Sequence, residues 1–576
     1  MARSPSTEGC CIEAATTSRR TRPANSWAAD RLAQSPTALA AHRQPPGVCE
    51  EVRPRRDPER DRRGHEGEGR QRRPPGHVPT AGSDPTSRAS EVADRTSTLD
   101  VWLIRNTAGP ALGGAQASSP GRLAASPVST DDARHPLRVT RRIAAGRYVQ
   151  DTVASFDETA SGRPRVLILG GGFAGVGAAQ RLKDADADVV LVDRRDYHTF
   201  QPLLYQLATG LLERTAVGHS LRDLVGHQDN TVFHQATVSG VDFDAREVRF
   251  DDRGPLSYDY LVMSIGAEVN YFGTEGAAEH AFPMYTLSDA VRLKRHLLER
   301  WNAADHDPSV IDDGALNVVV VGGGPTGVET AGAIAELYRA VFVKDYPGIP
   351  QERAQITLVE AGPELFSMFV PKLRSYAAKA LADRTVELRT GVAVASVSPT
   401  RVTLKSGEVL NAHTLVWGAG LQGNKLVQSM GLELQRGNRI GVDTDLTLLE
   451  HPEVFVVGDV AAIYDAKSEQ VLPQLGSVAL QSGEHAGDTI AHRIDGEKTK
   501  PFAYRDKGTM AAIGRGAACV QMLGGHTLTG RKAQVAWLTV HLALLPTNED
   551  RAKAVVDWVG EAATHQRTGR FTVEAG

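Results

Sequence analysis

The sequence contains few cysteines and no spacing typical of metal ligands. Of its four Cys residues, Cys10, Cys11 and Cys49 precede residue 150, which leaves Cys519 alone in the rest of the chain. Because a redox-active disulfide needs two nearby thiols, electron transfer through a cysteine pair is excluded. We predict no metal site and expect surface or capping roles for the scattered His residues, which include positions 280, 296, 485, 541 and 565.

The sequence also lacks an excess of one charge and a long apolar run. It has 65 Lys and Arg against 69 Asp and Glu, a net charge of −4, so we expect no nucleic-acid partner. No stretch reaches the ~20 apolar residues of a membrane-spanning helix, which argues against a proton pump. No apolar segment follows the N-terminal charges, so no secretory signal is expected.

Residues 1–161 show little sustained apolar periodicity. Arg- and Pro-rich runs occupy residues 53–57 and 70–76. Such a composition cannot bury enough surface to offset the entropy of ordering, so we predict a disordered extension. Two alternatives stay open: the basic clusters contact nucleic acid or an anionic surface, or translation begins downstream, near Val149 or Val153.

Two glycine fingerprints of the form G-x-G-x-x-G organise the rest of the chain. Each follows a short apolar run, Val166–Leu169 or Val318–Val321, and precedes an Ala-rich helical pattern. Glycine permits a tight turn and a close backbone approach to a pyrophosphate, which lies at the helix N-terminus. We therefore predict two dinucleotide sites, although either copy alone is also compatible with a chance glycine turn. The predicted cofactor-binding glycines are Gly170, Gly172 and Gly175 in the first fingerprint and Gly322, Gly324 and Gly327 in the second.

An acidic residue ends the strand that follows each fingerprint. Asp193 ends the apolar run 188–193, and Glu360 ends the run 355–360. A carboxylate at this place can accept hydrogen bonds from an adenosine ribose. The charge of Glu360 would repel a 2′-phosphate, and no arginine follows it, so the second site favours NADH over NADPH. The competing interpretation makes both residues ordinary solvated strand ends.

Three further segments resemble parts of flavoproteins that bind two dinucleotides. Residues 258–267, which include Gly266, resemble the return from the first domain, and residues 414–420, which end in Gly420, resemble the return from the second. Residues 454–461 contain Gly458 and Asp459 and resemble the segment whose aspartate holds the ribityl and pyrophosphate part of FAD. The resemblance assigns FAD to the first fingerprint and NADH to the second.

Within that superfamily the chain most resembles the type II NADH dehydrogenases, which are non-proton-pumping NADH:quinone oxidoreductases. The resemblance covers roughly residues 165–567, and its most specific stretches are 193–206, 327–337 and 502–515. It implies an FAD-dependent enzyme that takes hydride from NADH and passes two electrons to a quinone. We expect the protein to be cytoplasmic, and peripheral contact with the inner face of the cell membrane stays open. A homodimer also stays open.

The same resemblance suggests the residues that carry the chemistry. It places Glu329 at the hydride-transfer site, Gln481 near the electron acceptor and Gln201 along the flavin, beside Pro202 and Thr209. The competing view of Glu329 is a first-turn carboxylate that only complements the helix dipole. For Gln481, the competing view is an amide that only anchors flavin carbonyls.

The sequence departs from the family in two places. The quinone-side motif, roughly Ala-Gln-x-Ala-x-Gln, has Ser477 at its first glutamine. The C-terminal apolar segment is weak, because residues 533–545 form about 20 Å of helix, too short to cross a ~30 Å hydrocarbon core. Two other functions therefore stay open: a soluble NADH oxidoreductase with another acceptor, and a slow flavin-containing redox sensor.

A moderate amphipathic pattern follows at residues 550–566. Its apolar face contains Val555, Val556, Val559, Ala562 and Ala563. The basic residues that flank the C-terminal region can meet anionic head groups, and they are Arg531, Lys532, Arg567 and Arg570. The alternative is a pair of helices packed on the protein's own surface.

The predicted fold class is α/β, with two Rossmann-like dinucleotide-binding domains, a C-terminal segment and the disordered extension. We expect the first domain to be interrupted by the second. The predicted ranges are 1–161 for the extension, 162–285 and 426–515 for the two parts of the FAD-binding domain, 286–425 for the NADH-binding domain and 516–576 for a C-terminal helical segment that can contact a membrane surface.

Overall fold

The computed structural model describes residues 162–564. The expected disorder of residues 1–161, the alternative start sites, and the basic residues Arg567 and Arg570 lie outside this range.

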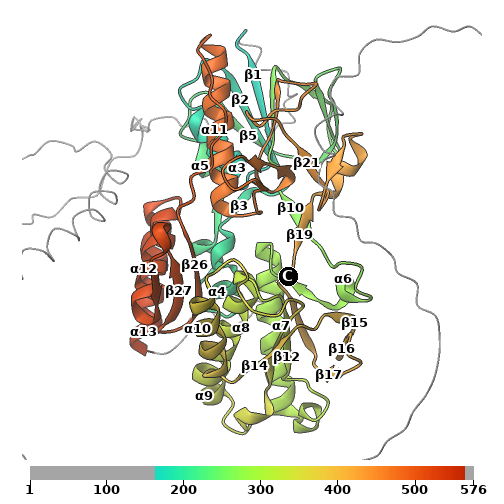
Figure 1. Cartoon of the computed structure of the whole chain (residues 1–576), viewed down its shortest axis with the longest axis vertical. Helices are drawn as coiled ribbons and strands as arrows, with labels where there is room; N and C mark the ends of the chain where they lie inside the picture. The colour runs from blue at the N-terminus through green and yellow to red at the C-terminus, as the bar shows by residue number, and fades with distance from the viewer. Residues whose placement is uncertain (1–161, 565–576) are drawn as a thin grey trace, which may run out of the picture. The chain divides into compact units, whose positions relative to one another are not determined.

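The first fingerprint belongs to a five-stranded parallel sheet (Figure 1). Its strands run in the order β22 (Val454–Val456), β9 (Tyr260–Met263), β1 (Arg165–Leu169), β2 (Asp188–Asp193) and β5 (Thr231–Gln235). The inner strands are buried almost along their whole length, as expected for a parallel sheet covered on both faces. The helices of this part are α3 (Phe173–Arg181), α5 (Leu221–Val225) and α11 (Gly476–Ile494).

The second fingerprint belongs to another five-stranded parallel sheet. Its order is β11 (Phe282–Pro283), β18 (Thr414–Trp417), β12 (Val318–Val321), β13 (Ile356–Glu360) and β14 (Val386–Thr390). Its helices are α7 (Leu287–His306), α8 (Pro325–Leu337), α9 (Val343–Asp345) and α10 (Pro371–Ala382). All five strands lie in sequence between β9 and β22 of the first sheet, so the first sheet is completed only after the second.

An antiparallel ribbon of β10 (Ala267–Val269) and β19 (Leu421–Gly423) carries the chain into and out of this insertion. Smaller antiparallel pairings are β3 (Tyr197–Thr199) with β4 (Gly218–Ser220) and β24 (Tyr464–Asp465) with β25 (Gln470–Val471). Three small sheets have three strands each. The first contains β6 (Val238–Asp242), β7 (Glu247–Phe250) and β8 (Leu256–Ser257), and the second contains β15 (Val394–Ser398), β16 (Arg401–Leu404) and β17 (Val409–Asn411). The third contains β20 (Leu434–Gln435), β21 (Arg439–Gly441) and β23 (Ala461–Ala462). Two short helices are α4 (Leu204–Ala208) and α6 (Ala277–His280).

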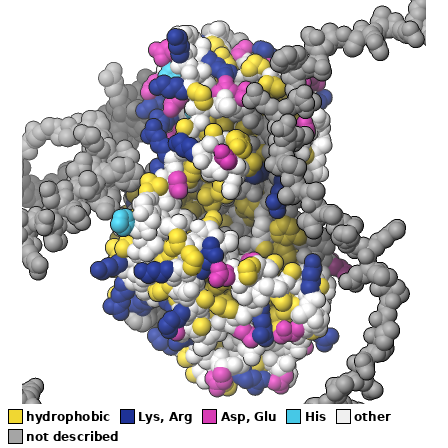
Figure 2. All heavy atoms as spheres, viewed as in Figure 1, with side chains coloured by type: hydrophobic (Ala, Val, Ile, Leu, Met, Phe, Trp, Pro, Cys, Tyr) yellow, Lys and Arg dark blue, Asp and Glu magenta, His cyan; other side chains and the backbone are white. Residues whose placement is uncertain are grey.

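Figure 2 shows hydrophobic side chains gathered across the middle of the face drawn.

The C-terminal part is a sheet covered by one helix, and a second helix packs on the first. Strands β26 (Thr509–Gly514), β27 (Ala517–Gln521) and β28 (Thr527–Thr529) are antiparallel. The apolar segment expected at 533–545 forms α12 (Gly530–Leu544), and the amphipathic segment expected at 550–566 forms α13 (Asn548–Thr564). Within residues 162–564, no helix combines the length and apolarity needed to cross a bilayer.

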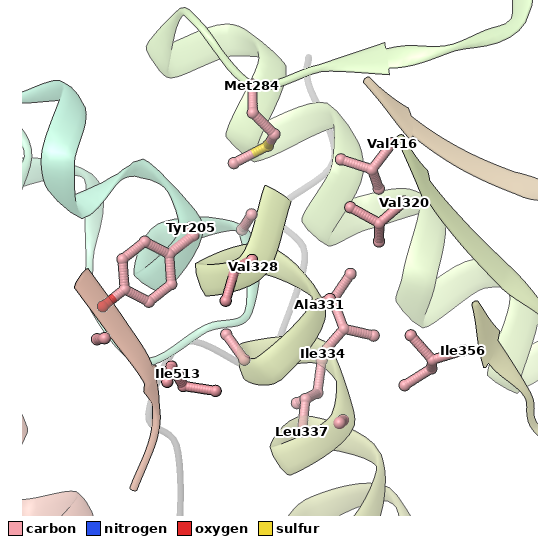
Figure 3. Close-up of a cluster of buried hydrophobic side chains, with 14 of the residues drawn as sticks. Tyr205, Met284, Val320, Val328, Ala331, Ile334, Leu337, Ile356, Val416 and Ile513 are labelled. Atoms are coloured by element: carbon pink, nitrogen blue, oxygen red, sulfur yellow. The ribbon is translucent and has the colours of Figure 1, made fainter. Parts of the chain in front are cut away.

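Helix α8 connects the second sheet to this C-terminal part. Figure 3 shows Val328, Ala331 and Ile334 of α8 between Val320 and Ile356 of the sheet on one side and β26 on the other. The contact with β26 is so close that a Cβ on Gly332 would lie 1.9 Å from the carbonyl oxygen of Ile513. Glycine is therefore required at this crossing.

The α/β class with two Rossmann-like units is confirmed. The domain limits at residues 285, 425 and 515 stay predictions.

Candidate functional site

The first fingerprint forms a tight turn after β1. Gly170 has φ +105°, and a Cβ there would lie 2.3 Å from the carbonyl oxygen of Ser264. A Cβ on Gly175 would lie 1.8 Å from the carbonyl oxygen of Gly170. Gly172 begins α3 without a side-chain cap, and open space surrounds the position of its missing Cβ.

The second fingerprint repeats this geometry after β12. Gly322 has φ +113°, and a Cβ there would lie 2.7 Å from the carbonyl oxygen of Gly418. A Cβ on Gly327 would lie 1.9 Å from the carbonyl oxygen of Gly322. Gly324 begins α8, again without a side-chain cap and with open space beside it.

These two helix starts fit the pyrophosphate groups of dinucleotides. The first N–H groups of an α-helix have no partner within the helix, and the dipole places partial positive charge there. Because neither Gly172 nor Gly324 supplies a capping side chain, both helix starts have donors left for an anion. The donor set and the free space therefore suit FAD and NADH.

The two predicted ribose-binding carboxylates occupy equivalent places. The Oδ2 atom of Asp193 accepts a hydrogen bond from the Gly171 N–H at 2.7 Å. Glu360 in turn accepts from the N–H groups of Gly323 and Gly362. Each carboxylate is thus held against the second residue of its own fingerprint, Gly171 or Gly323, and is only partly exposed. Ribose binding itself stays a prediction.

Residues predicted to surround FAD come together at Tyr285. The Tyr285 hydroxyl accepts a hydrogen bond from the Ala267 N–H at 3.1 Å, directly after Gly266, which has φ +70°. Burial raises the pKa of Tyr285 to about 12, the charge of Asp459 adds to this increase, and Gln201 opposes it. Three of the predicted residues, from three distant segments, therefore lie around one phenol.

Asp459 belongs to the same cluster. Burial raises its pKa to about 6, whereas the charge of Arg439 and the hydroxyl of Tyr285 lower it. The preceding residue, Gly458, has φ +73° and donates its N–H to the Oγ atom of Ser482 on α11 at 3.0 Å. Asp459 is therefore held in a polar group that suits the hydroxyls of a ribityl chain.

Glu329 is a buried carboxyl group in the second turn of α8. Its Oε1 atom accepts a hydrogen bond from the Ala512 N–H of β26 at 2.9 Å. Burial raises the pKa of Glu329 to about 8, while Ala512 and the indole of Trp537 lower it. Glu329 therefore keeps its proton near pH 7, so it is more than a solvated first-turn carboxylate.

Gln481 is bound to another segment of the chain. Its Nε2 atom donates to the Arg505 carbonyl oxygen, and its Oε1 atom accepts from the Arg505 N–H, both at 3.1 Å. One turn earlier on α11, the Ser477 hydroxyl lies 2.9 Å from the Tyr504 hydroxyl. Ser477, which replaces the first glutamine of the family's quinone-side motif, and Gln481 thus both connect α11 to residues 504–505 by hydrogen bonds.

Gly420 lies just beyond β18, with φ +80°. Strand β18 neighbours β12, which carries the second fingerprint. A Cβ on Gly420 would lie 2.3 Å from the ring of Phe272. The structure therefore places this predicted residue at the same edge of the sheet as Gly322, Gly324 and Gly327.

A buried row of side chains beside the first fingerprint was not predicted from the sequence. The Nδ1 atom of His198 lies 2.9 Å from the Gly171 carbonyl oxygen, and its ring stacks on His219. The Nδ1 atom of His219 lies 2.9 Å from the Oδ2 atom of Asp550 in the first turn of α13. The Thr547-x-x-Asp550 spacing is a capping-box pattern that could have identified Asp550 as the start of α13. No sequence pattern around Tyr285 or Trp537 could have identified these two residues as part of the site.

The chemistry of the described residues is restricted. Among residues 162–564, Cys519 is the single cysteine and is buried as a free thiol. No cluster of His, Cys, Asp or Glu in that range could hold a metal ion. The site therefore consists of two nucleotide cradles, the polar cluster at Tyr285 and the buried acid Glu329.

Comparisons with known proteins agree with this arrangement. The family model of the pyridine nucleotide-disulphide oxidoreductases matches residues 164–483. The chain is 34% identical over 425 residues to a type II NADH:quinone oxidoreductase of Mycobacterium tuberculosis, which covers 71% of this chain and 89% of the relative. It is 31% identical over 383 residues to a type II NADH:quinone oxidoreductase of Staphylococcus haemolyticus, which covers 65% and 93%.

Solved structures show the same fold. NDH2 from Plasmodium falciparum in complex with NADH aligns with a TM-score of 0.67 at 19% identity, over 71% of this chain and 99% of that one. The sulfide:quinone oxidoreductase of Aquifex aeolicus aligns with a TM-score of 0.54 at 19% identity, over 69% and 94%. The resemblance found in the sequence is confirmed, and the chain belongs to the type II NADH:quinone oxidoreductases, within the pyridine nucleotide-disulphide oxidoreductase family.

Proposed function

We infer that this protein is an FAD-dependent enzyme that oxidises NADH and passes two electrons to a quinone without pumping protons. The observation that carries this function is the pair of matched dinucleotide cradles in one chain of this family. Bound FAD and NADH supply the hydride chemistry, and the protein supplies orientation and electrostatics.

The residues around the cradles bind and orient the two nucleotides. The uncapped starts of α3 and α8 hold the pyrophosphates, and Asp193 and Glu360 hold the adenosine riboses. Asp459 accepts from hydroxyls of the ribityl chain, with Tyr285 and Gln201 beside it. Free backbone N–H groups suit the pyrophosphates, and carboxylates at strand ends suit the ribose hydroxyls.

Glu329 holds a proton on its carboxyl group next to the start of the NADH-binding helix. Since its pKa is about 8, the group is an uncharged donor at neutral pH. Reduction of a quinone consumes two protons as well as two electrons, so a protonated acid is useful at such a site. Gln481 acts differently: it fixes residues 504–505 against α11 and so shapes the acceptor side.

A two-step stopped-flow experiment tests the function. We expect NADH to bleach the flavin absorbance of the purified holoenzyme rapidly under anaerobic conditions, because the two cradles bring both nucleotides together. A menaquinone or ubiquinone analogue mixed in the second step should then restore the absorbance. Rapid reduction without quinone-dependent recovery would transfer the acceptor role to a protein or another small molecule.

Charge removal at Glu360 tests the coenzyme preference. We expect Glu360→Gln to raise the ratio of kcat/KM for NADPH to that for NADH by about 10-fold, because the repulsion of the 2′-phosphate is lost. Steady-state kinetics with both coenzymes measure this ratio. Glu364→Gln is the control, since that carboxylate is more exposed and pairs with Arg374. A wild-type enzyme that prefers NADPH would refute the role of Glu360.

Replacement of the Glu329 carboxyl group by an amide tests its buried proton. The folded-state pKa of about 8 lies above the usual 4.5, so the stability contributed by the neutral acid falls as pH rises from 4.5 to 8. We therefore expect Glu329→Gln to unfold with a free energy about 2–4 kcal/mol above wild type at pH 8 and with no difference near pH 4. Urea titrations with excess FAD measure this difference.

The same Glu329→Gln variant should turn over more slowly with quinone, because it has no proton to donate. Glu561→Gln, which changes a partly exposed carboxylate of α13, is the control and should change stability by less than about 0.5 kcal/mol. Parallel pH profiles for wild type and Glu329→Gln would contradict the assignment.

We propose that α12 and α13 contact the inner face of the cell membrane peripherally. Val556 and Val559 of α13 are 69% and 60% exposed, while this helix packs inward through Asp550 and Ala554. The apolar face predicted from the sequence therefore does not pack on the rest of residues 162–564. Val535 and Leu544 of α12 are exposed as well. The homodimer stays a prediction.

Paired substitutions test this contact. We expect Val556→Asp with Val559→Asp to weaken binding to anionic phosphatidylglycerol vesicles at least about 10-fold, because apolar area is lost from the docking face. Co-sedimentation at low salt measures the bound fraction. Val409→Asp on β17 adds a charge at another exposed valine and should leave binding unchanged. Wild-type protein that remains in the supernatant would exclude the contact.

A further inference from the structure

Phe272 has a backbone conformation that phenylalanine seldom adopts. Its φ is +51°, in the left-handed region that favours glycine. Its side chain is 66% exposed, so burial of the ring does little to offset this strain. The conformation therefore needs another explanation than packing in a core.

Hydrogen bonds hold the turn that contains Phe272. The Asn270 N–H donates to the Gly420 carbonyl oxygen at 3.2 Å, and the Trp417 indole N–H donates to the Asn270 carbonyl oxygen at 3.0 Å. The Asn270 side-chain oxygen accepts from the Phe272 N–H at 2.8 Å. Strained residues that several neighbours hold in place cluster at ligand-binding sites.

The ring of Phe272 lies directly against the backbone of Gly420. A Cβ at Gly420 would lie 2.3 Å from the Cζ atom of Phe272 and 2.7 Å from its Cε2 atom. Gly420 itself has φ +80°. Two unusual positions, a strained aromatic residue and a glycine, therefore fit each other at the end of β18.

The order of the strands identifies the half of NADH that reaches this place. Strand β12 lies between β13 and β18. The adenosine ribose belongs with Glu360 at the end of β13, and the pyrophosphate belongs with α8, which follows β12. A dinucleotide laid across this edge of a parallel sheet therefore extends its nicotinamide half towards β18 and Gly420.

We propose that Phe272 is a contact residue for the nicotinamide half of NADH, with its ring forming an aromatic wall beside Gly420. This inference rests on the proposed function, because it takes NADH as the ligand of the second cradle. The turn fixes this exposed ring before the ligand binds. The ring therefore gives contact area and excludes water at little cost in side-chain entropy.

Binding of NAD⁺ and ADP-ribose to the FAD-loaded protein tests the proposal by calorimetry. ADP-ribose has the adenosine and pyrophosphate parts but lacks nicotinamide. We expect Phe272→Gly to weaken NAD⁺ binding about 3- to 10-fold, the size of one aromatic contact, and to leave ADP-ribose binding unchanged. Phe272→Tyr, which keeps the ring, should bind NAD⁺ as wild type does.

The same variants test the strain. Phe272→Gly should raise the urea midpoint of unfolding, because glycine adopts this φ without penalty. Phe272→Leu should weaken NAD⁺ binding to a similar degree without this gain, since it keeps a Cβ and lacks the aromatic ring. Thr385→Gly is the matched control: φ there is +62° just before β14, at the far edge of the sheet from Gly420. It should raise the midpoint and leave NAD⁺ binding unchanged.

The outcomes separate this inference from the proposed function. Wild-type protein that binds neither NAD⁺ nor ADP-ribose, and whose flavin NADH does not reduce, would overturn the proposed function. If wild type binds both ligands, unchanged NAD⁺ affinity in Phe272→Gly and Phe272→Leu would overturn only the role of Phe272. Equal losses for NAD⁺ and ADP-ribose would also overturn it, because the effect would then not depend on nicotinamide.

Discussion

The burial of the Glu329 carboxyl group is the interaction on which the arrangement of the site depends. Its single backbone partner, the Ala512 N–H, lies on β26, so α8 and β26 must approach closely. That approach leaves no room for a side chain at Gly332. Trp537 of α12 faces the same carboxyl group. A charged carboxylate in such surroundings would be costly, so the group keeps its proton and its pKa rises to about 8. One acid thus links α8, the C-terminal sheet and α12.

The features that sequence reasoning predicted are those set by local constraints. A fingerprint glycine is needed where φ is positive or where two backbone segments meet, and both conditions hold at Gly170 and Gly322. An acid at the end of the following strand reaches the fingerprint because parallel strands end at one edge, as Asp193 and Glu360 do. These relations need only a strand, a turn and a helix, so the pattern of the sequence contains them.

The features that were missed depend on contacts between distant segments. Gln481 could be named from resemblance, but nothing in its neighbourhood indicated that Arg505 would occupy both ends of its amide. Tyr285 gains its role only when three segments fold around it. Periodicity also grouped Val556 and Val559 on one face of α13, yet it could not say whether that face meets the protein or its surroundings. The packing of Asp550 against His219 decides this, because it turns the valines outward.

Under the proposed membrane contact, α12 and α13 would dock on one side and pack against the buried part of the site on the other. Helix α12 buries Ala533, Trp537 and His541 along one side, and Trp537 on this side faces the Glu329 carboxyl group. Its other side exposes Val535 and Leu544. A membrane bound at the exposed side would lie against the helix whose Trp537 faces Glu329. Asp550 connects α13 through His219 and His198 to the first fingerprint. Docking at this face would thus act on both the buried acid and the flavin cradle, through contacts already formed within the protein.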